Sequence, residues 1–145
     1  MKKKLNCVLL VDDDEQDNFF HKIVLEKAGI TNNIEIAKNG RKALDFITTK
    51  GEYRESESSY PQPELIFLDI NMPVMDGWKF LEEYQNLEDV KKGNTIIIML
   101  TTSLNPADKI YAEKFIEGSC FQFKPLTVGM INEIMQLHFP EYLCI

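Results

Sequence analysis

Short apolar runs alternate along the chain with segments whose apolar residues recur at helical spacing. The runs cover residues 5–11, 34–37, 65–69, 95–100 and 120–123. Continuous apolar runs of this length are typical of strands buried on both faces of a parallel sheet. Helical spacing marks residues 15–28, the stretch after Asn39-Gly40, and residues 76–84, 106–117 and 128–138, the last ended by Pro140. The pattern predicts five consecutive strand–helix units, hence an α/β fold with helices on both faces of a parallel sheet and right-handed crossovers.

The helical spacing also predicts which side chains face the core. In residues 15–28 we expect Phe20, Ile23, Val24 and Ala28 on the inward face, and Gly29 as the residue that stops the helix. In the next two helices the expected inward residues are Ala43, Phe46, Ile47, Phe80, Leu81 and Tyr84.

Composition narrows the class of protein. A chain of 145 residues with a hydrophobic content of 44% suits one domain with a substantial core. The net charge of −7 opposes nucleic-acid binding, because phosphate contacts need clustered Lys and Arg. The basic start, Lys2 to Lys4, precedes only a short apolar run, so it predicts neither a signal peptide nor a membrane span, and we expect a cytoplasmic protein. Cys7, Cys120 and Cys144 form no CxxC pair, and we expect Cys7 and Cys120 to be reduced and apolar in character.

The residues that directly follow the strands carry the candidate chemistry. They are Asp12, Asp13 and Asp14 after the first strand, Asp69 at the end of the third, Thr101 and Thr102 after the fourth, and Lys124-Pro125 after the fifth. In a doubly wound sheet, ligands bind outside the carboxyl ends of the strands, where the strand order reverses. We therefore expect these side chains at one edge of the sheet.

This set of residue types points to a metal and a phosphoryl group. Carboxylates a few ångströms apart repel each other by about 4 kcal/mol at an effective dielectric constant of about 20, and a divalent cation removes that repulsion. Oxygen ligands without His or Cys suit Mg²⁺. A carboxylate beside the metal is also a nucleophile toward phosphorus, while Thr101 and Lys124 would neutralise charge on the phosphoryl oxygens.

Taken singly, each of these residues has a simpler interpretation. Asp12 to Asp14 could be a charge cluster at a helix N-terminus, Thr101 a capping or loop hydroxyl, and Lys124 a solvated charge. Their occurrence together, all at strand ends, favours the combined site.

In order and over residues 5 to about 139, the chain resembles the receiver domain of two-component response regulators, in the stretches VLLVDDDE, LIFLDINMPVMDGW, IIIMLTTS and FQFKP. The resemblance implies a flavodoxin-like (βα)5 fold with strand order 2-1-3-4-5. It makes Asp69 the phospho-acceptor, with Mg²⁺ held by Asp69, Asp13, Asp12 through water, and the backbone carbonyl of Asn71. Thr101 and Phe121 would be the switch pair, Lys124 the phosphate-pairing lysine, and Lys124-Pro125 a cis peptide. Because Phe121 lacks a hydroxyl, a tyrosine-type hydrogen bond in the output state is not expected.

The resemblance further implies a function. Residues 1–145 would form a single receiver domain, with its core at 5–139 and no output domain. It would accept a phosphoryl group from a sensor histidine kinase or phosphotransfer protein and then change its affinity for an unidentified protein partner. Its self-phosphorylation and autodephosphorylation would be slow, so it is a signalling protein more than an enzyme. The long polar insertion and the "LTTS" stretch most resemble single-domain regulators of phytochrome-type or hybrid sensor kinases.

Several alternatives stay open from the sequence. A haloacid-dehalogenase-like phosphatase would use similar residues but needs its nucleophile in a DxD after the first strand, and a flavodoxin-like cofactor binder needs a phosphate loop there. The polar stretch 50–63 is either a tolerated insertion or a partner-contact loop. The apolar tail, Phe139, Tyr142, Leu143 and Ile145, either packs on the body of the domain or forms a homodimer contact. His21 and His138 are interpreted as packed or solvent-facing residues, with a docking role as the alternative for His21.

Overall fold

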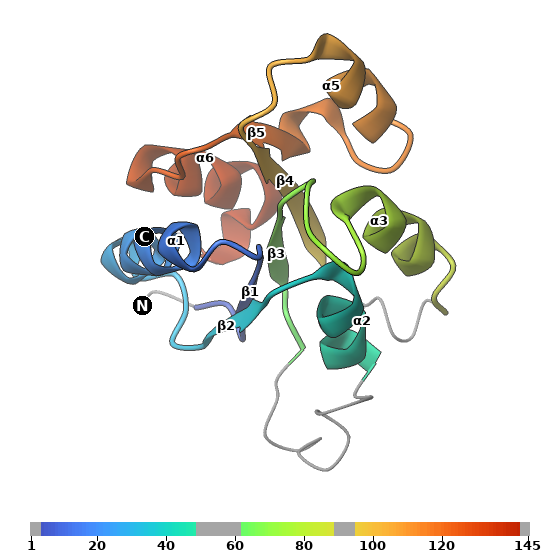
Figure 1. Cartoon of the computed structure of the whole chain (residues 1–145). Coiled ribbons are helices and arrows are strands. Elements are labelled where there is room, and N and C mark those ends of the chain that lie inside the picture. The colour runs from blue at the N-terminus through green and yellow to red at the C-terminus, as the bar shows by residue number, and fades with distance from the viewer. Residues whose placement is uncertain (1–3, 49–61, 89–94, 143–145) are drawn as a thin grey trace.

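The strands form one parallel five-stranded sheet in the order β2-β1-β3-β4-β5 (Figure 1). The computed structural model describes residues 4–48, 62–88 and 95–142. Its elements are β1 (Val8–Val11), α1 (Glu15–Ala28), β2 (Ile34–Ala37), α2 (Gly40–Thr48), β3 (Leu65–Leu68), α3 (Gly77–Gln85), β4 (Ile96–Thr101), α5 (Pro106–Ala112), β5 (Phe121–Phe123) and α6 (Val128–His138). The predicted α/β flavodoxin-like fold and its strand order are therefore confirmed.

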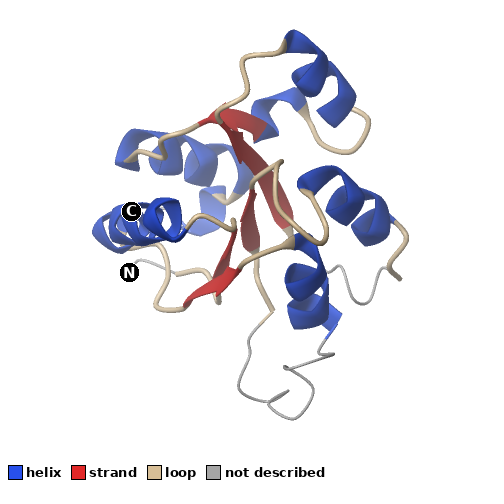
Figure 2. Cartoon of the chain, in the orientation of Figure 1, coloured by secondary structure: helices blue, strands red, loops and turns tan. Residues whose placement is uncertain are grey.

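The sheet separates two apolar layers. Helices α1 and α6 cover one face, and α2, α3 and α5 cover the other (Figure 2). Successive residues of a strand point to opposite faces, so Val8 and Leu10 pack with α1 and α6, whereas Leu9 and Val11 pack with α2 and α3. Both faces of the central strands are thus buried, which is why their sequences are apolar without alternation.

Helix α1 begins and ends at the residues that its sequence indicates. Asp14 is the N-cap, and its side chain accepts hydrogen bonds from the amides of Gln16 and Asp17. Gly29 is the C-cap with a φ of 66°, a conformation that glycine adopts without steric cost, and its amide donates to the Leu25 carbonyl.

The inward face of α1 differs from the prediction. Its buried residues are Asn18, His21, Val24 and Leu25, whereas Phe20 is 48% exposed. The prediction for Phe20 was wrong because the polar residues Asn18 and His21 occupy the inward face of this turn, beside the acidic end of the sheet. A rule based on hydrophobicity places Phe20 on that face instead.

Two elements have bounds that differ from the predicted ones by more than one residue. Strand β1 begins at Val8, and Leu5 makes only an isolated bridge to Thr31. Helix α5 ends at Ala112 instead of continuing to Glu117. Turns follow in which the Lys114 amide donates to the Tyr111 carbonyl and the Phe115 amide to the Ala112 carbonyl, both three residues back and therefore tighter than an α-helix. In these turns Phe115 and Ile116 pack against the apolar layers of the core. The weak amphipathicity of residues 106–117 did not indicate where the helix ends.

The described part of the tail packs on the body of the domain. Phe139 and Tyr142 are buried in the layer formed by α1 and α6, and the Tyr142 hydroxyl donates to Glu64 Oε2 over 2.8 Å. Cys7 and Cys120 are buried and free, as predicted. The predictions for most of the 50–63 stretch, Leu143, Cys144 and Ile145 fall outside the described residues. Within those residues, no helix combines the length and the apolar character needed to cross a bilayer.

Candidate functional site

The parallel ladder continues one residue past several strands and brings their polar successors to one edge of the sheet. The Asp69 amide donates to the Val11 carbonyl over 2.9 Å, and the Lys124 amide donates to the Thr101 carbonyl over 2.8 Å. The Asp12 amide donates over 3.0 Å to Ala37. Strand order reverses between β1 and β3, so Asp12 and Asp69 flank the crevice where doubly wound sheets bind ligands.

Three carboxylates in this crevice are close enough to share a cation. One oxygen from each of Asp12, Asp13 and Asp69 lies within 4.8 Å of the others. All three donors are oxygens, which suits a hard divalent cation. The same residues line an open cavity of about 510 Å³ together with Asn71 and Lys124, as well as Asp14, Asp17 and Thr102. The donor set therefore fits the predicted metal, with space left for further ligands.

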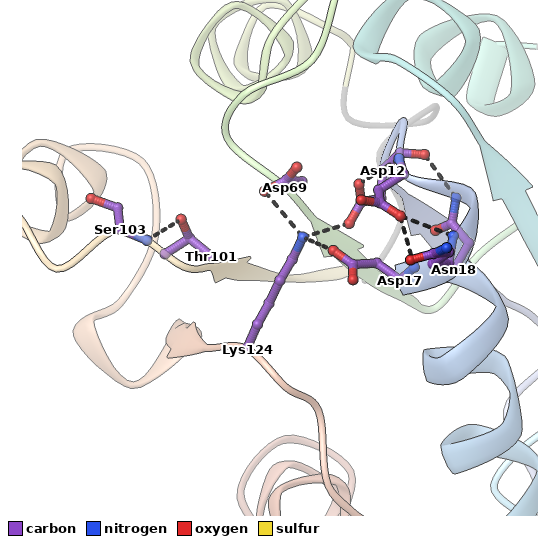
Figure 3. A network of polar contacts seen from close by, with 9 residues as sticks. Asp12, Asp17, Asn18, Asp69, Thr101, Ser103 and Lys124 are labelled. Atoms are coloured by element: carbon purple, nitrogen blue, oxygen red, sulfur yellow. Dashed lines mark hydrogen bonds and ion pairs between the residues drawn. The ribbon is translucent and has the colours of Figure 1, made fainter.

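The Lys124 ammonium lies at the centre of the acids (Figure 3). Its Nζ is 2.7 Å from Asp12 Oδ2, 2.8 Å from Asp17 Oδ2 and 3.6 Å from Asp69 Oδ1. Burial alone lowers the pKa of Lys124, but the hydrogen bonds to Asp12 and Asp17 and the charge of Asp69 outweigh it, so the net pKa is raised. Lys124 is consequently a fixed positive charge. The Lys124-Pro125 peptide is cis, the isomer that the resemblance implied.

Asp69 is poorly solvated for an acid. Its side chain is only 14% exposed, and burial, followed by the charge of Asp12, raises its pKa from 3.8 to about 6, although Lys124 acts in the opposite direction. A carboxylate with such a pKa is ionised at neutral pH and more basic than an ordinary aspartate, both of which favour nucleophilic attack.

Close approach of backbone fixes the position of Asp69. The Gly77 amide donates to the Ile70 carbonyl over 2.7 Å, and a Cβ at Gly77 would collide with the carbonyl oxygen of Asp69. Only glycine fits at the start of α3 without displacing the loop that carries the acid. Asp76, immediately before it, is the N-cap of that helix.

The predicted switch residues, Thr101 and Phe121, do not line the cavity. Thr101 is 2% exposed, and its Oγ1 accepts a hydrogen bond from the Ser103 amide over 3.0 Å. Phe121 is buried in the layer formed by α2 and α3, with its ring edge-on to Phe123. In this state Thr102, and not Thr101, contributes to the cavity wall.

Sequence reasoning missed the contribution of α1 to the site. Asp17 bonds to Lys124, and the Asn18 side-chain amide donates to the Asp12 carbonyl over 2.8 Å. His21 is buried and lines a small cavity together with Asp12 and Asp69. Burial, followed by the charge of Lys124, lowers the pKa of His21, so the ring is neutral at pH 7. The role of Asp17 could have been predicted from the sequence. The helix begins directly after the acidic residues Asp12 to Asp14, so an acid in its first turn lies at the same edge of the sheet.

Comparison with known proteins gives the same picture. The family model described as response regulator receiver domain matches residues 8–134. Response regulator Rcp1 of Synechocystis sp. is 33% identical over 129 residues, which are 89% of this chain and 83% of Rcp1.

Solved structures of response regulators have the same fold as this chain. A two-component response regulator from Cytophaga hutchinsonii has a TM-score of 0.77 at 26% identity, covering 95% of this chain and 99% of that one. The Mn²⁺-bound form of Rcp1 has a TM-score of 0.70 at 25% identity, covering 97% and 96%. These matches favour a receiver domain over the haloacid-dehalogenase-like phosphatase and the flavodoxin-like cofactor binder that the sequence left open. The chain belongs to the response regulator receiver domain family and acts in two-component signal transduction.

Proposed function

We propose that this receiver accepts a phosphoryl group on Asp69 with the help of Mg²⁺, and that the donor is a sensor histidine kinase or a phosphotransfer protein. The observation that carries the proposal is the position of Asp69: a largely buried carboxylate at the end of β3, 3.6 Å from Lys124 Nζ and within 4.8 Å of the Asp12 and Asp13 carboxylates.

The proposed step is a displacement at phosphorus. An Asp69 carboxylate oxygen forms a bond to phosphorus, and the bond from phosphorus to the donor nitrogen or oxygen breaks. The leaving group departs with the electron pair of that bond, and Asp69 becomes an acyl phosphate. Lys124 balances charge on the phosphoryl oxygens, and its raised pKa keeps it protonated through the step.

Asp12, Asp13, Asp69 and the Asn71 carbonyl are proposed to hold the metal. Bound there, Mg²⁺ would supply positive charge to the transferring group and relieve the repulsion among the acids. Two observations support a divalent cation: the oxygen-only donor set, and a Mn²⁺-bound structure of the related Rcp1. The same elements would allow slow phosphorylation by small donors and slow autodephosphorylation.

The signal is proposed to reach a protein partner through Thr101 and Phe121. Phosphorylation would draw the Thr101 hydroxyl away from the Ser103 amide toward the new oxygens, and Phe121 would follow. The surface affected is formed by α5, β5 and α6, where Ile110 and Phe123 are exposed.

We further propose that the chain works as a stand-alone receiver in the cytoplasm. A homodimer also stays a prediction, to be tested by light scattering before and after phosphorylation.

Incubation with acetyl phosphate and Mg²⁺ tests the proposal. We expect one phosphoryl group per chain by intact mass, stable in acid and labile in base, and none after Asp69→Asn. Asp45→Asn is the matched control, because Asp45 pairs with Arg41 on α2 and lies outside the cavity. Full phosphorylation of the Asp69→Asn variant would refute Asp69 as the acceptor.

A further inference from the structure

Asp17 is an acid of the site that none of the roles above uses. Its Oδ2 is 2.8 Å from Lys124 Nζ, almost as close as Asp12 at 2.7 Å and closer than Asp69 at 3.6 Å. The Asp17 side chain is 39% exposed and that of Lys124 is 10% exposed, so the pair lies where the cavity opens to solvent.

Local structure at the start of α1 leaves the Asp17 carboxylate available for this contact. Asp17 is the third helical residue after the N-cap Asp14, a position whose side chain often reaches back to the N-cap amide. Here that amide already donates to Asp12 Oδ1 over 3.0 Å. Asp14 in turn accepts from the Asp17 amide over 3.1 Å, which fixes the backbone of Asp17. The carboxylate is therefore free to bind Lys124 without loss of a cap.

We propose that Asp17 is a positioning residue that holds Lys124 away from Asp69 in the unphosphorylated protein and so competes with the phosphoryl group for this lysine. An ammonium group has three N–H donors, and the hydrogen bonds to Asp12 and Asp17 occupy two of them. In Figure 3 both of these carboxylates lie to the right of Nζ, and Asp69 lies to its upper left. A phosphoryl group on Asp69 attracts the ammonium in the other direction, and the Asp17 bond, at the solvent-facing end, is the one that weakens. This inference rests on the proposed function, since it assigns Lys124 to the phosphoryl oxygens.

A change of charge near the metal acids has to be separated from this competition. Removing the Asp17 charge weakens cation binding at Asp12 and Asp13 through simple electrostatics, which by itself would reduce phosphoryl binding. Measurements at saturating Mg²⁺ eliminate that contribution. Glu15→Gln is the matched control: it removes one negative charge from the same turn of α1, but Glu15 bonds to Lys38 over 3.0 Å and not to Lys124.

The experiment measures binding of beryllofluoride, a mimic of the phosphoryl group, by fluorine NMR of the full chain at saturating Mg²⁺. We expect Asp17→Asn to bind it about tenfold more tightly than wild type, equivalent to about 1.4 kcal/mol. Glu15→Gln and the charge-conserving Asp17→Glu should stay close to wild type. Asp17→Ser, which also removes the charge, should reproduce the gain, and thermal unfolding confirms that each variant is folded. A purely structural role for Asp17 predicts weaker binding.

The outcomes separate the two proposals. Unchanged or weaker binding by Asp17→Asn and Asp17→Ser, with normal binding by wild type, overturns the role of Asp17 and leaves the proposed function intact. Absence of binding by wild type itself overturns the proposed function and this inference with it.

Discussion

Replacing Asp69 with Asn should stabilise the metal-free protein at neutral pH, although it removes the proposed acceptor. Burial and the charge of Asp12 raise the pKa of Asp69 from 3.8 to about 6, so the folded chain binds this proton more tightly than the unfolded chain. Wild-type stability therefore falls as pH rises through the window from about 4 to 6, and the full penalty persists above it. Each pH unit is worth about 1.4 kcal/mol, which gives a penalty of about 3 kcal/mol as an upper limit.

The amide of Asn has nearly the same shape as the carboxyl group and carries no charge. At pH 7.5 without divalent cations, we expect the free energy of unfolding of Asp69→Asn to exceed that of wild type by about 2–3 kcal/mol. At pH 4 the two proteins should be nearly equal, because wild-type Asp69 is then protonated. Adding Mg²⁺ at pH 7.5 should stabilise wild type more than the variant and reduce the difference.

Urea denaturation at several pH values, followed by circular dichroism with chelator present, measures this difference directly. Glu15→Gln serves as the control, since its side chain is 80% exposed and the substitution should give no comparable pH profile. A stability difference that is constant from pH 4 to 8, or a variant less stable than wild type at pH 7.5, would refute the reasoning that burial and Asp12 destabilise the Asp69 carboxylate.

Three further substitutions test individual backbone and side-chain contacts, one at the site and two elsewhere in the domain. Gly77→Ala should lower the free energy of unfolding by about 1–3 kcal/mol and slow phosphorylation by acetyl phosphate, because its Cβ would displace the Asp69 carbonyl; unchanged values for both would contradict this. Gly129→Ala, in α6 with no atom closer than 3.8 Å to the added Cβ, should instead raise stability by about 0.5–1 kcal/mol in the same denaturation assay. Tyr142→Phe should cost about 1–2 kcal/mol through loss of the hydrogen bond to Glu64, and a loss below about 0.5 kcal/mol would mean that ring burial alone holds the tail.

Features with a strong local cause were predictable from the sequence. The run Leu65–Leu68 is buried on both faces and had to be an inner strand, and Gly29 stops α1 as its position indicated. Strand order and the cis Lys124-Pro125 peptide came from resemblance to a family, since neither follows from the periodicity of the chain. Residues that meet only through tertiary structure were harder to assign.

Asp17 and Phe20 show this limit. The partner of Asp17, Lys124, is 107 residues away in sequence, and no local pattern connects the two. Phe20 was assigned to the core by hydrophobicity, yet the inward face of α1 is set by contacts of Asn18 with Asp12 and by burial of His21. At the edge of a sheet where charged groups gather, polar side chains compete successfully for buried positions, so a hydrophobic pattern is least reliable beside the site.

If Asp69 is the phospho-acceptor, as proposed, the charge balance of the site predicts that acceptance of a phosphoryl group depends on a cation from outside the chain. Among the described residues, Lys124 is the only cation that contacts these acids, and its two short bonds go to Asp12 and Asp17. Asp69 has the longer 3.6 Å contact with Lys124, and burial, followed by the charge of Asp12, raises the pKa of Asp69. A phosphoryl group adds further negative charge at the same place. One lysine would not neutralise both charges, so we expect cation binding at the acids and phosphoryl binding at Asp69 to favour each other. Lys124 would then move from the acids to the phosphoryl group only once a cation supplies the acids with a second positive charge.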